Sequence, residues 1–257
     1  MAVVYALKKG MNKMTDRITL RIKFSKHGNI RFIGHLDVMR FFQKAIRRAQ
    51  IDVSYTQGYS PHQIMSFASP LGVGLESDAE YMDLDVNSLT SCQEIKNRIN
   101  AVSVPGIRVQ SVKILPSDAG NAMASVAAAS YEVSFRPGRE PKLDITQAIE
   151  CFLEKDHIFY TKETKKGTRE IDLKEGIYSF VWEQNRFTML LDASSAGNIK
   201  PKQVIEALLK ENGEVLSENA LIVRRTEMYL NLGSEEVPDF APLDAIGLDT
   251  LSKGDAS

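Results

Sequence analysis

The strongest constraint on the fold is a change of hydrophobic period near the start of the chain. Residues 17–25 (RITLRIKFS) alternate apolar and polar side chains, a pattern that predicts a half-exposed strand. In residues 34–50 the apolar side chains instead recur every three or four positions, which predicts an amphipathic helix. Because each element has to bury one apolar face, we expect them to pack together in an α+β domain.

The alternation of strands and helices continues along the chain. Within residues 17–115 it predicts further strands at 51–55, 64–68, 80–86 and 107–114, and a second helix at 91–101. Within residues 131–232 it predicts strands at 131–135 and 221–230, helices at 145–153 and 201–210, and hairpins within 158–173 and 177–192. We therefore predict two ferredoxin-like β-α-β-β-α-β units that arose by duplication, although no residue-level repeat is visible.

Three further segments complete the predicted organisation. Residues 1–16 are interpreted as an N-terminal extension, and residues 116–130, which are mostly small, as a linker between the units. Residues 233–257 contain six acidic residues and one lysine, so we predict a flexible acidic C-terminal tail.

The composition narrows the class of protein. Of 257 residues, 43% are hydrophobic and 25% are charged, as in ordinary soluble globular proteins. Cys92 and Cys151 are too few for a disulfide framework or an iron–sulfur centre, and they favour a reducing compartment. The sequence has no apolar run that could span a bilayer, no Walker-type loop and no dinucleotide fingerprint. We expect a cytoplasmic protein with no membrane segment, no metal and no cofactor of its own.

Basic residues are concentrated in one part of the chain. Residues 21–62 contain eight lysines and arginines against two acidic residues, and the cations of the predicted helix lie away from its apolar face. Aromatic side chains beside cations suit single-stranded nucleic acid, because bases stack while cations hold phosphates. The predicted anion-binding surface comprises Lys26, Arg31, Arg40, Lys44, Arg47, Arg48, Tyr55, Thr56, Gln57, Tyr59 and His62. The alternative is a solvated face whose cations complement the helix dipole.

A second hypothesis treats the chain as an enzyme in its own right. His35, Asp37 and His62 could line a pocket formed by the glycine-bearing loop at residues 69–74 (SPLGVG), with His62 as the best acid–base candidate. The spacing of the histidines matches no metal-binding motif, so we expect no metal there. Asp172, within the run KKGTREIDL, is interpreted as part of a charged hairpin tip.

Two long runs carry a resemblance to a known family. KHGNIRFIGHLDVMRFFQKAIRRA and YTQGYSPHQIMSFASPLGVGLESDAEYMD resemble the radical-SAM-linked domain of unknown function, a bacterial family fused or adjacent to cobalamin-binding radical SAM proteins. Gly34, Tyr59, Ser60 and Gln63 depart from the pattern of the family, which leaves position 34 without a side chain for an N-cap.

The resemblance implies a partner rather than a reaction. It suggests an accessory binding module for a radical SAM enzyme that recognises RNA, such as transfer RNA, through the basic helix and the turn that follows it. Two alternatives stay open: the stand-alone enzyme, and a structural module that docks onto its partner through an apolar sheet face.

Overall fold

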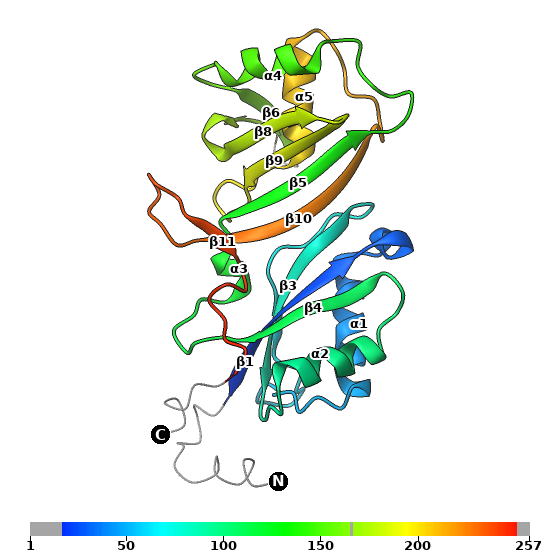
Figure 1. Cartoon of the computed structure of the whole chain (residues 1–257), viewed down its shortest axis with the longest axis vertical. Helices are drawn as coiled ribbons and strands as arrows, with labels where there is room; N and C mark the ends of the chain where they lie inside the picture. The colour runs from blue at the N-terminus through cyan, green and yellow to red at the C-terminus, as the bar shows by residue number, and fades with distance from the viewer. Residues whose placement is uncertain (1–16, 165–166, 251–257) are drawn as a thin grey trace. The chain divides into compact units, whose positions relative to one another are not determined.

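The computed structural model describes residues 17–164 and 167–250, which form two compact α+β units (Figure 1). The first unit contains residues 17–74, 80–124 and 243–250, and the second contains residues 75–79, 125–164 and 167–242. Each unit is described by itself below. The predicted N-terminal extension at residues 1–16 lies outside the described residues.

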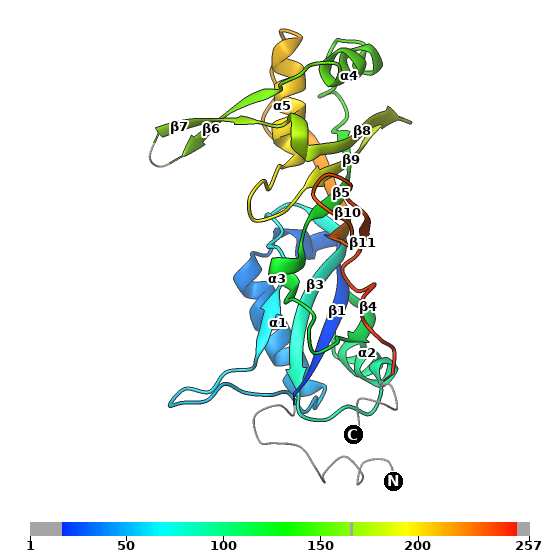
Figure 2. The same cartoon turned by 90° about the vertical axis from the view of Figure 1, so that its left-hand side faces the viewer.

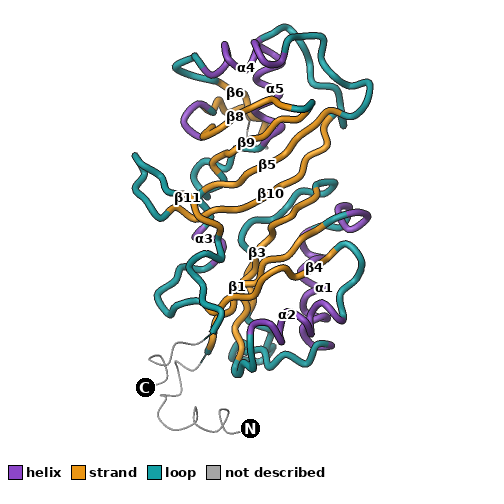
Figure 3. The backbone as a smooth tube through the Cα atoms, viewed as in Figure 1, coloured by secondary structure: helices purple, strands orange, loops and turns teal. Residues whose placement is uncertain are grey.

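The first unit places two helices on one sheet (Figure 3). Its strands occur in the sheet order β4-β1-β3, and β2 pairs with β3. Its elements are β1 (Ile18–Lys26), the 3-10 turn η2 (Gly28–Phe32), α1 (His35–Arg48), β2 (Met65–Phe67), β3 (Glu76–Val86), α2 (Cys92–Ala101) and β4 (Ile107–Ile114). This order along the chain follows the predicted β-α-β-β-α-β sequence.

The core of the first unit lies between the sheet and the two helices. β1 buries alternate residues Leu20, Ile22 and Phe24, and α1 turns its apolar stripe toward them. The rings of Phe24 and Phe42 meet edge to face at 4.6 Å. Because the apolar side of α1 is used for this packing, its cationic side has to face outward.

The second unit has the same strand order with an added ribbon. Its strands run β10-β5-β9-β8, and Glu76 and Ser77 of β3 pair in parallel with β10, so the sheet is mixed. The elements are β5 (Ala128–Phe135), α4 (Ile145–Leu153), β6 (Phe159–Thr164), β7 (Gly167–Asp172), η3 (Lys174–Gly176), β8 (Ile177–Glu183), β9 (Arg186–Asp192), α5 (Pro201–Glu211), β10 (Leu221–Asn231) and β11 (Phe240–Pro242). In both units the last strand lies beside the first, followed by the third and the second, when the β6–β7 ribbon and the three-residue strand β11 are set aside.

The structure confirms the four predicted main helices, but one predicted strand is wrong. Residues 51–55 form isolated bridges, Val53 with Val86 and Tyr55 with Gln63, instead of a ladder. The strand predicted at 80–86 begins earlier, at Glu76.

The division between the two units falls between Ala124 and Ser125, inside the predicted linker, part of which is folded. The predicted flexible tail is wrong where the structure describes it. Ala122, in the short helix α3 (Ala122–Ser125), is buried, and its amide donates to Asp83 of β3. Past residue 233, β11 pairs with β10, and Leu248 exchanges two 2.8 Å backbone hydrogen bonds with Ile114. Apolar residues within the acidic segment supply this packing, and only residues 251–257 of the predicted tail lie outside the described part.

Candidate anion-binding surface

Helix α1 holds the exposed cations in place. It begins at His35 after Gly34, whose backbone is extended and which has no side chain to cap the helix. Asp37 lies in the first turn, and Arg47 and Arg48 lie in the last, where each charge favours the helix dipole.

The basic side chains of α1 differ in whether they form ion pairs or hydrogen bonds within the protein. Arg40 contacts Asp37 at 3.3 Å, but both side chains are more than half exposed, so the pair is weak. Arg48 donates to the carbonyl of Val102 at 3.2 Å. Within the described ranges, Lys44 and Arg47 have no acidic partner within 4 Å, which leaves their charges available to a ligand.

The turn after α1 is closed by its own hydrogen bonds. The His62 amide donates to the Thr56 hydroxyl at 3.1 Å, and the Thr56 amide donates to the His62 carbonyl at 2.9 Å. Gly58, at φ +115°, provides a backbone conformation that other residues rarely adopt. Tyr59 is therefore held at the tip with its ring fully exposed, and Tyr55 is 44% exposed.

One hydrogen bond joins the turn to the helix. The side-chain amide of Gln63 is buried and donates to the Gln43 carbonyl of α1 at 3.3 Å. Arg40 and Arg47 stand three residues before and four residues after Gln43, so they share its side of the helix. The aromatic turn and these two arginines thus belong to one side of the first unit.

Lys26 does not belong to this surface. It is 2% exposed, and its ammonium donates to the carbonyl of Ile33 at 3.0 Å and to that of Arg31 at 3.4 Å. The prediction that Lys26 contacts an anion at the surface is therefore wrong. Arg31 is half-buried, and its guanidinium lies 4.8 Å from the Phe32 ring. Gln57 is exposed in the turn, as predicted.

The three predicted catalytic residues do not share a pocket. Asp37 is exposed beside Arg40, and His62 is exposed and bonded to Thr56. His35 alone lines a small cavity that has room for about one water molecule. The prediction of one site built from these three side chains is therefore wrong.

The cavity beside His35 has a lining that the sequence reasoning missed. Buried Lys26 and Glu80 and half-buried Ser69 border it, together with Phe24, Val38, Phe67 and Leu71. Glu80 could have been singled out in the sequence, because it is an acidic residue inside a strand whose other positions are mostly buried. Two buried ionisable groups beside a histidine could hold a small polar molecule, but the space is too small for a substrate.

Two other kinds of feature are absent from the part of the chain that the structure describes. No group of three or more His, Cys, Asp or Glu side chains there could hold a metal ion. No helix there is both long and apolar enough to cross a membrane.

Comparisons with known proteins add a family and a distant structural likeness. No curated protein matches the sequence significantly. A chain in the crystal structure of a Cbf5-Nop10-Gar1 complex is similar at 11% identity and a TM-score of 0.44. The likeness covers 86% of this chain and 52% of that chain, so this chain spans about half of its length. Residues 19–201 match the family described as an uncharacterized protein conserved in bacteria (DUF2344). The match covers most of both units, and the chain belongs to this family.

Proposed function

We propose that this protein is an accessory module that holds an RNA strand, such as part of a transfer RNA, for a radical SAM enzyme that supplies the chemistry. The observation that carries the proposal is the cationic side of α1 next to a turn tipped by exposed tyrosines. The link to a radical SAM partner comes from the sequence resemblance.

The chemistry of the surface matches that of a single strand. Arg40 and Arg47 offer forked donors for phosphate oxygens, and Lys44 adds a point charge. Tyr55 and Tyr59 offer exposed rings, and stacking of a base on such a ring contributes about 1–3 kcal/mol. A surface that holds phosphates and stacks bases without reading their edges would bind RNA with little sequence preference.

A second observation favours a protein contact at the start of α1. Phe32, the last residue of η2, and Leu36, in the first turn of α1, are 59% and 65% exposed. Val73 is exposed in the loop whose Gly74 amide bonds to the Arg31 carbonyl. Single exposed apolar residues are ordinary, but a group of them suits a partner. We propose that the radical SAM enzyme docks here. We also propose that the shared strand order of the two units reflects a duplication.

Binding of a labelled single-stranded RNA, followed by fluorescence anisotropy across a salt series, tests the RNA proposal. The variant Arg40→Gln/Lys44→Gln/Arg47→Gln should bind weakly, and the slope of log affinity against log salt should flatten by about 2, since each phosphate contact in a single strand contributes about 0.7. The control Arg108→Gln/Arg139→Gln/Lys210→Gln removes three exposed cations elsewhere and should bind like the wild type. Equal affinity of both variants would refute the proposal.

Capture of the native protein with its partner tests the docking proposal. Wild-type protein should retain an iron–sulfur protein, and Phe32→Ser/Leu36→Ser should lose it while keeping RNA affinity. Retention by the variant, or the absence of any cluster-bearing protein from the wild-type sample, would contradict this part of the proposal.

A further inference from the structure

The β6–β7 ribbon of the second unit has one basic face and one acidic face. Its register places Lys162 opposite Arg169 and Tyr160 opposite Ile171. Because side chains alternate between the two faces of a strand, these four residues share one face. Glu163 and Glu170 pair with Thr168 and Thr161 and therefore lie on the other face.

The cross-strand pair on the basic face is unfavourable by itself. Lys162 and Arg169 are both exposed, and like charges that stand directly opposite in a two-stranded ribbon repel each other. In residues 17–164 and 167–250, neither has an acidic partner within 4 Å. A bound anion would remove this repulsion.

Helix α5 lies on the same side as the basic face. The Tyr160 hydroxyl, on the face of Lys162, donates to Glu206 of α5 at 2.8 Å. Figure 2 shows the ribbon beside α5 and apart from the main sheet of this unit. The basic face is thereby turned toward α5, whose N-cap residue is Lys200.

The surroundings of Lys200 are also positively charged. Lys200 is exposed as a whole residue, but partial desolvation of its ammonium lowers its pKa, and the positive charges of Arg225 and Lys162 lower that pKa further. Arg225, on β10, is 1% exposed. The carboxylate that reaches this region from α5, Glu206, is already shared by Tyr160 and Lys202. Lys200 therefore lies within the range of the positive charges of Arg225 and Lys162.

We propose that Lys162, Arg169 and Lys200 form a second phosphate-binding site, which takes a backbone phosphate of an RNA strand. The inference rests on the proposed function, because the RNA is the same ligand. The binding site is formed by a ribbon that is inserted between α4 and β8 and has no counterpart in the first unit.

The test uses the full chain, the same labelled RNA and two independent readouts. In the variant Lys162→Gln/Arg169→Gln, we expect RNA affinity to fall by about tenfold and the salt slope to flatten by about 1. The control Arg139→Gln/Lys210→Gln removes two exposed cations of the same unit and should change neither. Acylation of lysines, read by mass spectrometry, should be reduced by RNA at Lys162 and Lys200 but not at Lys210.

The outcomes separate this inference from the proposal for α1. Unchanged affinity in the ribbon variant, with no protection of Lys162 or Lys200, overturns the second site even if the α1 variant binds weakly. A weak ribbon variant with protected lysines supports the second site even if the α1 variant binds normally, and the proposal for α1 then fails by itself.

Discussion

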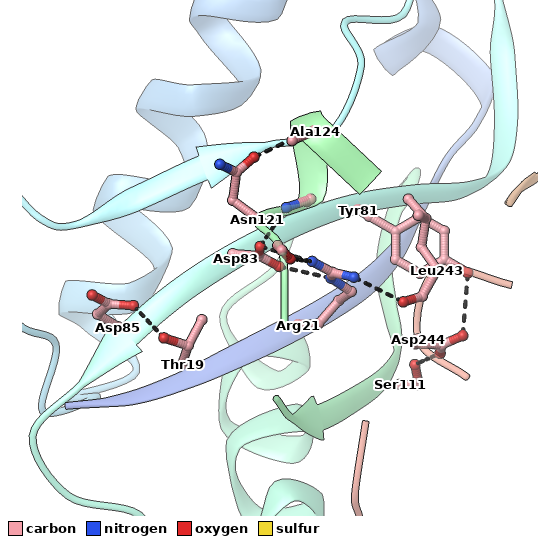
Figure 4. A network of polar contacts seen from close by, with 12 residues as sticks. Thr19, Arg21, Tyr81, Asp83, Asp85, Ser111, Asn121, Ala124, Leu243 and Asp244 are labelled. Atoms are coloured by element: carbon pink, nitrogen blue, oxygen red, sulfur yellow. Dashed lines mark hydrogen bonds and ion pairs between the residues drawn. The ribbon is translucent and has the colours of Figure 1, made fainter. Parts of the chain in front are cut away.

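A buried ion pair in the first unit, between Arg21 and Asp83, tests how β1 and the segment after β11 are fixed to β3. The Arg21 guanidinium forms a two-pronged contact with Asp83, at 2.9 and 3.0 Å, and also donates to the carbonyls of Leu243 and Gly120, each at 2.9 Å (Figure 4). Asp83 further accepts the Ala122 amide at 2.6 Å. One arginine thus joins β1, β3, the segment before α3 and the segment after β11.

Replacing Arg21 with methionine should be strongly destabilising. Arg21 is fully buried, so the change leaves the Asp83 carboxylate without its guanidinium and two carbonyls without a donor. Removal of one partner from a buried ion pair costs about 3–5 kcal/mol. We expect a loss of about 4 kcal/mol of unfolding free energy, a large share of the stability of a typical domain.

A paired variant keeps this test interpretable even if the single variant folds poorly. Arg21→Met/Asp83→Leu removes both charges, and apolar replacement of a buried pair is often close to neutral. The double variant should therefore be more stable than Arg21→Met alone. Urea unfolding followed by circular dichroism measures the difference, and hydrogen exchange of peptides from β1 and residues 243–250 locates it. A double variant less stable than Arg21→Met, or a single variant within about 1 kcal/mol of wild type, would refute the reasoning.

Two further predictions concern a glycine and a carboxylate. Gly106 has φ +96°, and a Cβ there would lie 2.5 Å from the His27 carbonyl oxygen, so Gly106→Ala should cost about 2 kcal/mol or more. Gly34→Ala, where nothing lies within 4 Å of an added Cβ, is the control and should leave the thermal midpoint nearly unchanged. The hydrogen bond from Arg224, and then that from Arg186, lowers the pKa of Glu132 below its ordinary 4.5. The contacts of ionised Glu132 with Arg224 and Arg186 therefore stabilise the fold above pH 4.5, by about 1 kcal/mol. This contribution is lost as the pH falls through the lowered pKa of Glu132 in the folded state. Glu132→Gln should be less stable at pH 7 but show a flatter acid dependence of the urea midpoint, and parallel curves for the two proteins would count against this assignment.

The main helices and most of the strands could be predicted from local sequence patterns alone. Their hydrophobic periods are local properties, because a helix or strand with one apolar side needs only some partner to bury it. The outward cations of α1 followed in the same way, since Val38, Phe42 and Ile46 determine which side packs inward. The turn that carries Tyr59 was also predictable from the sequence, because Gly58 favours a turn at that position.

Sequence patterns did not predict which polar residues are buried and which segments outside the main elements pack against them, because these features depend on the folded structure. Alternation places Lys26 on the face of β1 that also carries buried Ile22 and Phe24, but only the fold brings the carbonyls of Arg31 and Ile33 to its ammonium. The acidic C-terminal segment looked flexible by composition, yet Leu243 and Leu248 reach partners more than a hundred residues away. The basic face of the β6–β7 ribbon depends on the pairing register and on α5. The contacts of Leu243 and Leu248, and the hydrogen bond from Tyr160 to Glu206 of α5, join residues distant in the sequence. Local periodicity does not encode such contacts.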